Sequence, residues 1–115
     1  MSARPLEGLR VIDLTAFNGE LCPRLLSDLG AEVIKVEPPT GSPARNYAPV
    51  RKGVSLSFAV NNAGKLSVAL DLNNSDDFAK FHDLLNHADV LITSTKDVKE
   101  GLSVEAVSKA HPHLV

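Results

Sequence analysis

The sequence has 115 residues, of which 43% are hydrophobic and 23% charged, and its 12 basic and 14 acidic side chains give a net charge of −2. This length fits one domain with a modest core, and the charge balance gives no reason to expect nucleic acid or an anionic membrane as a partner. No apolar run approaches the roughly 20 residues of a membrane span, no signal-peptide stretch is evident, and a single cysteine favours a reducing, cytoplasmic setting.

The first predicted elements form a strand–helix–strand unit. Residues 9–15 have the apolar, β-branched centre of a buried parallel strand, residues 20–29 predict a helix that stops at Gly30, and residues 31–37 predict a second strand. A right-handed crossover with parallel pairing is strongly favoured for such a unit. Prolines and glycines then predict a long, partly irregular stretch over residues 38–62. The helix carries apolar side chains at helical spacing, namely Leu21, Leu25, Leu26 and Leu29.

The second half of the chain repeats the alternation of strand and helix. Residues 67–72 predict a strand. Asn74 is a good helix start, because its side chain can cap the first N–H groups of the helix and the acids at 76 and 77 lie beside the positive end of the helix dipole. Residues 89–92 predict another strand, residues 104–110 a short helix, and Leu114 the start of a further strand. The whole pattern predicts an α/β fold, with an open, mostly parallel Rossmann-like sheet that has helices on both faces.

Glu37 and Cys22 are the first residues to weigh as functional. Glu37 ends the second strand about 20 residues after the first turn, where a Rossmann unit has its ribose-binding acid. That turn has one glycine instead of the pattern G-x-G-x-x-G, so NAD binding is not expected and Glu37 is interpreted as a solvated charge. Cys22 lies near a predicted helix N-terminus, where a thiolate is favoured, yet its apolar neighbours favour a small buried side chain.

The histidines and two strand aspartates give no catalytic or metal signature. His82 and His87 do not share a helical face, so they are not placed as metal ligands. These two histidines, and the two that flank Pro112, are interpreted as exposed and inert. Asp13 and Asp71 lie within strands, where acids are disfavoured, so their side chains are expected to bind nearby backbone N–H groups. No metal site is expected.

Several motifs follow one another in an informative order. They are PLEGLRVIDLT at 5–15, LLSDLGAEVIKVEPP at 25–39, KLSVALDL at 65–72 and HPHLV at 111–115. In order and spacing this string resembles the N-terminal segment of family III CoA-transferases, the group that includes formyl-CoA transferase, carnitine CoA-transferase and α-methylacyl-CoA racemase. The resemblance covers nearly the whole chain.

The resemblance implies transfer of CoA between acyl-CoA thioesters and carboxylic acids, with coenzyme A as co-substrate and no metal. Two alternatives stay open, an acyl-CoA racemase of the same family and a non-catalytic binding or oligomerisation module with the same fold. Family members form interlocked homodimers, so a homodimer, or association with the remaining part of the enzyme, is expected. In the family, the adenosine and phosphates of CoA lie along the strand ends. The corresponding positions are Asn18, Pro38, Leu70, Asn73, Ser94, Thr95 and Lys96.

The resemblance also implies where catalysis takes place. The family's catalytic residue is an aspartate that takes up the acyl group as a mixed anhydride, and it lies beyond the equivalent of Val115. No catalytic residue is therefore expected in this chain. Residues 1–115 are interpreted as an incomplete, N-terminal Rossmann-like CoA-binding segment. Within it, Lys96 keeps a cation at the end of the segment TSTK, where the family has E-N-F-R.

Overall fold

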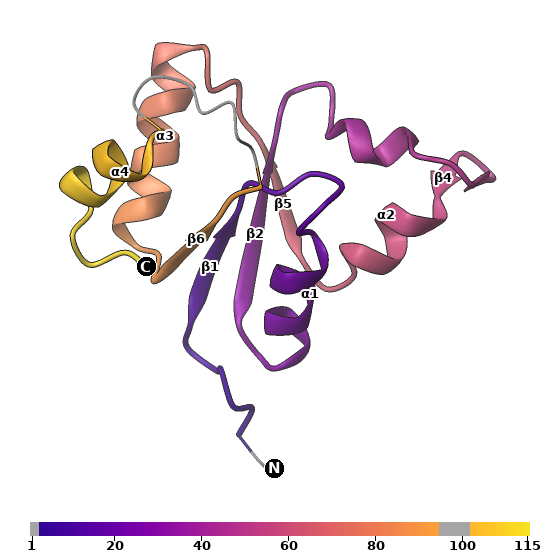
Figure 1. Ribbon diagram of the computed structural model, residues 1–115, viewed down its shortest axis with the longest axis horizontal. Coiled ribbons are helices and arrows are strands. Elements are labelled where there is room, and N and C mark those ends of the chain that lie inside the picture. Colours follow the sequence, from indigo (N-terminus) through magenta and orange to yellow (C-terminus); the bar gives the residue numbers. More distant parts are fainter. Residues whose placement is uncertain (1–2, 95–101) are drawn as a thin grey trace.

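A four-stranded parallel sheet forms the centre of the computed structural model, which describes residues 3–94 and 102–115 (Figure 1). The strands are β1 (Arg10–Asp13), β2 (Glu32–Glu37), β5 (Leu66–Ala69) and β6 (Val90–Ile92). Their spatial order is β5-β2-β1-β6, and β1 is parallel to both of its neighbours. Numbered along the chain within this sheet, the order is 3-2-1-4, as in doubly wound α/β folds. The predicted fold class is confirmed.

The register of the sheet explains the apolar runs of the sequence. Val11 pairs with Val33 and Val90, and Ile12 pairs with Ile34 on one side. Successive side chains of a strand point to opposite faces, so Val11 and Ile12 enter different layers, and both are fully buried. A strand that is covered on both faces needs apolar residues at consecutive positions, which is what the sequence supplies.

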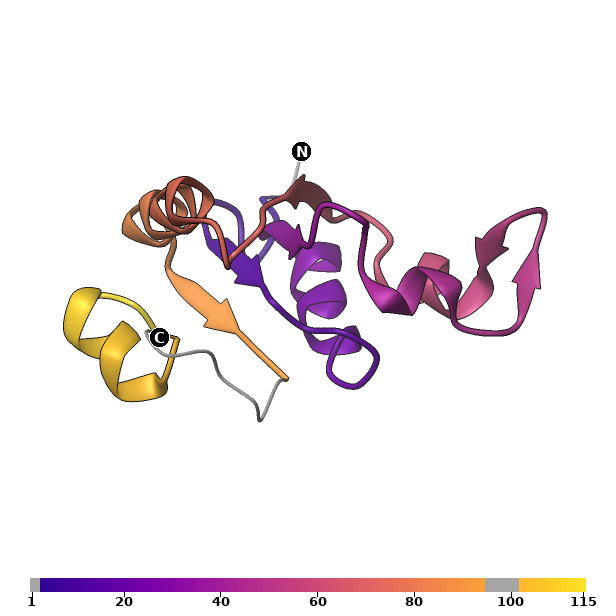
Figure 2. The same cartoon turned by 90° about the horizontal axis from the view of Figure 1, so that it is seen from above.

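Helices cover both faces of the sheet. Helix α1 (Leu21–Asp28) connects β1 to β2 on one face, whereas α3 (Ser75–Asn86) and α4 (Val104–Ala110) lie on the opposite face (Figure 2). The chain moves outward from β1 to β5 and then returns to the other side of β1. Because crossovers between parallel strands are right-handed, this change of direction moves the connecting helices to the second face.

The main core lies between the sheet and α3. Phe81 and Leu85 are fully buried there. The predicted helix start is confirmed, since the side chain of Asn74 accepts hydrogen bonds from the backbone N–H groups of Asp76 and Asp77 at 3.0 and 3.1 Å. The predicted range of α4, residues 104–110, is also confirmed. The buried members of this core are Ile12, Val36, Leu70, Phe81, Leu85, Ala88 and Val107.

The stretch from 38 to 62 contains more regular structure than its prolines and glycines predicted. It extends away from the sheet, to the right in Figures 1 and 2. Its capping serines explain how short elements form, because Ser42 accepts from the Ala44 N–H and Ser55 from the Phe58 N–H. The elements are a 3₁₀-helix η1 (Pro43–Asn46), strands β3 (Val50–Arg51) and β4 (Val54–Ser55), and helix α2 (Leu56–Asn61).

Helix α1 faces differently from the sequence-based interpretation. Cys22 is exposed, so its interpretation as a buried side chain is wrong. Pro23 takes the fully buried position in the first turn instead. Leu21 and Leu25 are each 51% exposed, and Leu29 is 46% exposed. Leu26 is the helix leucine that packs against the buried cluster on this face. Most of the apolar stripe of α1 therefore points outward.

The interpretation of the histidines as exposed is wrong for His111 and His82. His111 is 3% exposed, and its Nε2 lies 2.8 Å from Nδ1 of the half-buried His82. The two rings are stacked, with centroids 5.1 Å apart. Burial lowers the pKa of His111, and the nearby His82 and His113 lower it further. These rings join α3 to the end of α4, whereas His87 and His113 are exposed as expected.

The outer edge of β6 carries the last residue of the chain. The Val115 N–H donates to the Asp89 carbonyl at 3.1 Å, and the Leu91 N–H donates to the Val115 carbonyl at 2.9 Å. Such alternate bonding to one residue is the pattern of a parallel ladder. The strand start predicted at Leu114 is thus represented by a single residue that extends the sheet beyond β6.

We expect Phe81→Ala to destabilise the fold by about 3–5 kcal/mol, because it removes a fully buried aromatic ring from the main core. The measurement is the free energy of unfolding in urea. The matched control is Val104→Ala, at a position 75% exposed on α4, which should change that free energy by less than about 0.5 kcal/mol. Similar losses for both variants would contradict the assignment of this core.

Candidate functional site

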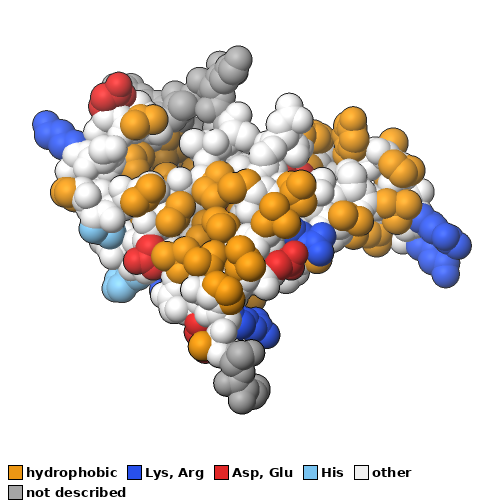
Figure 3. Space-filling model, turned by 60° about the horizontal axis from the view of Figure 1, so that its bottom comes forward, with side chains coloured by type: hydrophobic (Ala, Val, Ile, Leu, Met, Phe, Trp, Pro, Cys, Tyr) orange, Lys and Arg blue, Asp and Glu red, His pale blue; other side chains and the backbone are white. Residues whose placement is uncertain are grey.

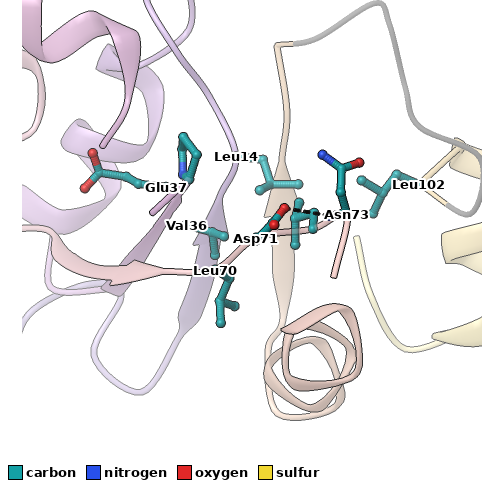
Figure 4. A pocket seen from close by; sticks show the side chains of 9 residues that line it. Leu14, Val36, Glu37, Leu70, Asp71, Asn73 and Leu102 are labelled. Carbon is teal, nitrogen blue, oxygen red and sulfur yellow. Dashed lines mark hydrogen bonds between the residues drawn. The ribbon is translucent and has the colours of Figure 1, made fainter. Parts of the chain in front are cut away.

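A cavity of about 250 Å³ opens at the carboxyl ends of β1, β2 and β5 (Figure 4). Open α/β sheets bind ligands beyond this edge. The lining is mainly leucine and valine with a few polar groups, and none of the described lining side chains is cationic. Such a lining suits an uncharged, flat part of a ligand better than a phosphate. The lining residues are Leu14, Val36, Glu37, Pro38, Leu70, Asp71, Leu72, Asn73 and Leu102.

Three of the residues predicted to bind CoA lie together in this cavity. Pro38 follows β2, whereas Leu70 and Asn73 follow β5. The Leu70 N–H donates to the Glu37 carbonyl at 2.8 Å, which holds the two strand ends together. The Asp71 carboxylate accepts from the Asn73 N–H at 2.9 Å, as the dashed line in Figure 4 shows. This bond confirms the backbone-binding role expected of Asp71 and fixes the turn that presents Asn73.

The other predicted residues are not brought into this cavity. Asn18 lies in the loop between β1 and α1 and lines a second cavity of about 340 Å³, together with Phe17 and Tyr47. The Ser94 hydroxyl accepts from the Ala16 N–H at 3.2 Å and donates to the Ala16 carbonyl at 3.3 Å. Ser94 therefore connects the end of β6 to the loop between β1 and α1, residues 14–20, which is called the first loop below. Thr95 and Lys96 lie outside the described residues.

Gly19 allows the first loop to pass close to the end of β6. Its φ is +91°, a left-handed value that favours glycine. A Cβ atom at this position would lie 3.3 Å from Cβ of Ser94, closer than a comfortable packing distance. A side chain at residue 19 would therefore require Ser94 or the loop to shift by a few tenths of an ångström.

Beside the first loop lies a buried network of two lysines and two carboxylates. The side chains of Asp13, Glu20, Lys35 and Lys65 are all between 0% and 3% exposed. The Lys35 Nζ donates to Glu20 at 3.0 Å, and the Lys65 Nζ donates to Asp13 at 2.8 Å. Since unpaired buried charges are costly, the equal numbers of the two signs make this cluster tolerable.

The network holds both ends of the first loop. At its start, Asp13 accepts from the Thr15 N–H at 2.7 Å and from the Thr15 hydroxyl at 2.6 Å, which confirms the role expected of Asp13. The Lys35 Nζ donates to the Thr15 carbonyl at 2.7 Å. At its end, the Lys65 Nζ donates to the Glu20 carbonyl at 2.9 Å. Burial lowers the pKa of Lys65, and its hydrogen bond to Asp13 opposes that shift.

Asn62 connects this network to the end of α2. Its amide group donates to the Glu20 carboxylate at 2.8 Å, and its carbonyl oxygen accepts from the Lys65 Nζ at 2.7 Å. The network therefore joins β1, β2, the first loop, the end of α2 and the residue that precedes β5. Of these elements, β1 and β2 end at the cavity described above, where Leu14 and Val36 line it.

Glu37 is buried and paired, so its interpretation as a solvated charge is wrong. Its side chain is 3% exposed and accepts from Arg45 through Nε at 2.7 Å and Nη2 at 2.8 Å. The Ser42 N–H donates at 2.9 Å, and the Ser67 hydroxyl donates as well. Arg45 lowers the pKa of Glu37 to about 2 against the opposing effect of burial, with help from both serines. Glu37 therefore holds the segment 38–62, which projects from the sheet, at the end of β2 through Ser42 and Arg45.

One signal in the sequence could have revealed part of the network. Lys35 interrupts an apolar strand, and an alternating pattern assigns its side chain to the interior. In the parallel register Lys35 is the partner of Asp13, which places opposite charges side by side on one face. No comparable signal marks Lys65, because the direction of its side chain depends on the fold of the preceding segment.

A metal site and a membrane-spanning helix are two further features that residues 3–94 and 102–115 could carry. Over these ranges, no three His, Cys, Asp or Glu side chains are grouped so that they could hold a metal ion. In the same residues, no helix has the length and apolar character required to cross a membrane.

Comparison with known proteins places these observations in a family context. The family model described as CoA-transferase family III matches residues 6–115. Acetyl-CoA:oxalate CoA-transferase of Acetobacter aceti is 39% identical over 96% of this chain and 30% of its own length. The succinyl-CoA–L-malate CoA-transferase beta subunit of Chloroflexus aurantiacus is 36% identical over 96% of this chain and 29% of its own length. The chain thus spans about 30% of the length of these relatives.

Solved structures agree with this similarity. Rv3272 from Mycobacterium tuberculosis gives a TM-score of 0.85 at 38% identity, over 98% of this chain and 33% of that protein. A CAIB/BAIF family protein from Brucella suis gives a TM-score of 0.87 at 33% identity, over 99% of this chain and 32% of that protein. The similarity therefore extends over the sheet and both helix layers.

The lowered pKa of Glu37 predicts a pH-dependent effect of Glu37→Gln. The folded-state pKa is lowered from 4.5 to about 2, so the carboxylate stabilises the fold above pH 4.5, and this stabilisation is lost as the pH falls through about 2. The wild type should exceed the variant in free energy of unfolding near neutral pH, and the difference should shrink between those two values. Glu32→Gln, at a 44% exposed carboxylate, should cost less than about 1 kcal/mol. A difference that stays constant with pH would contradict the pairing.

Lys65→Met should destabilise the fold by about 3–5 kcal/mol, because it leaves Asp13 and Glu20 with one lysine between them. Denaturant unfolding at neutral pH measures this loss. Lys80→Met is the matched control, since the Lys80 side chain is 68% exposed and its change should be below about 1 kcal/mol. Equal stability of Lys65→Met and the wild type would refute the buried network.

Proposed function

The chain belongs to CoA-transferase family III, and from that premise we propose that residues 1–115 form the N-terminal, Rossmann-like CoA-binding segment of an enzyme that transfers CoA between an acyl-CoA thioester and a carboxylic acid. The named activities of the relatives support this reaction class, since they are acetyl-CoA:oxalate and succinyl-CoA–L-malate CoA-transferases. Because the chain spans about 30% of their length, the complete activity is proposed for the whole enzyme and CoA binding for this segment.

The observation that carries the proposal is the cavity at the strand ends. Pro38, Leu70 and Asn73 come from two different strand ends and line one cavity of about 250 Å³. Its apolar lining suits the faces of an adenine ring, and the Asn73 amide offers both a donor and an acceptor to the ring edge. Coenzyme A is therefore the proposed co-substrate, with its adenine ring in this cavity.

The remaining predicted residues are proposed to bind the rest of CoA. Ser94, Thr95 and Lys96 follow β6, and the Lys96 cation is proposed to meet a phosphate, which the cavity itself does not attract. Asn18 is proposed to bind the cofactor from the first loop. The buried network supports this role, because a loop that is held at both ends loses less conformational freedom on binding.

The proposal includes association and cellular location. Association, as a homodimer or with the remaining part of the enzyme, is supported by the exposed leucines of α1. A cytoplasmic location is supported by the single cysteine, which suits a reducing compartment. The chemistry proposed for this segment is binding and orientation of CoA, and no residue of the segment is proposed to carry the acyl group.

We expect calorimetric titration of CoA into the protein to show submillimolar binding. Asn73→Asp should weaken the affinity for CoA by about tenfold, which is about 1.4 kcal/mol. The variant replaces an amide donor with a negative charge close to a polyanionic ligand. Asn86→Asp makes the same chemical change at an exposed position at the end of α3 and should leave the affinity unchanged. Equal affinities for the Asn73 variant and the wild type would reject the cavity as the site.

A further inference from the structure

The four histidines of the chain all belong to α3, α4 or the residues that directly follow these helices. His82 lies within α3 and His87 follows it, whereas His111 and His113 follow α4. Figure 3 shows histidine side chains, in pale blue, at the left edge of the surface, the side on which α3 and α4 lie in Figure 1. His111 is buried among more exposed histidines. Because histidine titrates near neutral pH, pH can act on the fold here.

A hydrogen bond joins the rings of His82 and His111, which are called the histidine pair below. Nδ1 of His82 lies 2.8 Å from Nε2 of His111, and the ring planes differ by 18°. Two nitrogens at this distance share one proton. The other nitrogen of His111, Nδ1, is buried and has no hydrogen-bond partner in the described part of the chain. In the neutral pair Nδ1 therefore carries no proton, because a buried N–H without an acceptor is costly, and Nε2–H of His111 donates to His82.

This geometry leaves one position for an additional proton. The neutral pair has two protons, one between the rings and one on Nε2 of His82. While the hydrogen bond is intact, the remaining nitrogen is Nδ1 of His111, where a third proton makes a buried cation with an unpaired N–H. Burial accordingly lowers the pKa of His111 below its ordinary value of 6.5, and His82 and His113 lower it further. Acid protonates the pair readily only when the rings separate.

The surroundings of the pair do not offset this effect. The groups that act on the charge of His111 are His82 from α3 and His113 from the residues after α4, and both are bases. In residues 3–94 and 102–115, no histidine forms an ion pair with a carboxylate. The charged residues in the last two turns of α3, before β6 and in α4 are all exposed, namely Lys80, Asp83, Asp89, Glu105 and Lys109. Solvent therefore screens their charges.

We propose that the histidine pair makes the packing of α4 on α3 dependent on pH, so that in mild acid the pair takes up a proton, the rings separate and α4 withdraws from α3. Helix α4 has seven residues, of which Val107 is the buried one, so the pair is a large part of what holds it. An unfolded histidine titrates at 6.5 and His111 in the fold titrates lower. The stabilisation by the pair is therefore complete above pH 6.5 and declines as the pH falls below this value.

The position of Leu102 connects this contact to the cavity at the strand ends. Leu102 directly precedes the cap of α4, packs against the main core and lines the cavity. Withdrawal of α4 removes this part of the wall, so the affinity for CoA should fall in acid. This consequence rests on the proposed function, whereas the pH dependence of the helix contact does not.

Amide hydrogen exchange at about pH 7.5 and about pH 5.5, followed by nuclear magnetic resonance, tests the proposal. We expect the Val107 N–H of α4, which donates to the Ser103 carbonyl, to lose up to about tenfold in protection in acid, because a released ring with a pKa of 6.5 is then about ten times more often charged than neutral. The Leu29 N–H of α1, which donates to the Leu25 carbonyl, should keep its protection. Unchanged protection of Val107, or an equal loss at Leu29, would overturn the proposal.

His111→Gln is the matched variant. The glutamine amide takes the place of Nε2 and can donate to His82 or accept from it without gaining a proton. This variant should keep α4 protected at about pH 7.5 and lose most of the dependence on pH. His87→Gln makes the same change at an exposed histidine and should respond to acid as the wild type does. An acid response of His111→Gln equal to that of the wild type would contradict the role of the pair.

The titration of His111 in the wild type is a second measurement that needs no variant. Resonances of the imidazole nitrogens should place the proton of neutral His111 on Nε2, and protonation of this ring should coincide with the loss of α4 protection. Protonation of His111 while α4 keeps its protection would refute the proposal.

CoA titration separates this inference from the proposed binding site. The wild type and His111→Gln are compared at the same pH, because phosphate groups themselves titrate at about pH 6. The two proteins should bind CoA equally at about pH 7.5, and the wild type more weakly at about pH 5.5. Equal affinities in acid, with α4 open in the wild type, would reject the connection to the cavity. Absence of CoA binding at either pH would reject the proposed site and leave the pH-dependent helix contact standing.

Discussion

The pairing of Lys35 and Lys65 with Asp13 and Glu20 is the interaction on which the arrangement of the site depends. Each lysine bonds to a carboxylate and also to a backbone carbonyl of the first loop. Removal of these charges from water is costly, and the cluster offsets this cost through close pairing and nearly complete hydrogen bonding. Because its members come from β1, the first loop, β2 and the residue before β5, these four parts of the chain are held in one relative position.

The two faces of strand β2 contact layers of different chemistry. Ile34 and Val36 point into the apolar core beneath α3, whereas Lys35 and Glu37 point to the face where ion pairs hold the loop and the projecting segment. Alternation along a single strand thus links the hydrophobic core to the polar framework of the site. The cavity lies where the two layers meet, which explains why Val36 and Glu37 both line it.

The sequence predicted the sheet and the helices well because their signals are local. Asn74 caps α3 by its own side chain, and α4 has its predicted range. The sequence could not show which side of α1 faces the sheet, so the interpretation of Cys22 as a buried side chain is wrong. Tertiary packing brings Arg45 to Glu37 and His82 to His111, so local sequence signals do not show these partners. Pro38, Leu70 and Asn73 line one cavity and Asn18 lines a different one, and their role in CoA binding stays a prediction.

The buried network also restricts how this protein can diverge. A replacement of Lys35 or Lys65 alone leaves a buried carboxylate without its partner, and a replacement of Asp13 alone leaves a buried lysine without its partner. Neutral drift at these positions therefore has to pass through compensated pairs of substitutions, and intermediates with one change are selected against. Homologues should accordingly either keep the whole set of charges or lose opposite members together, so that these positions covary although they lie up to 52 residues apart in the chain.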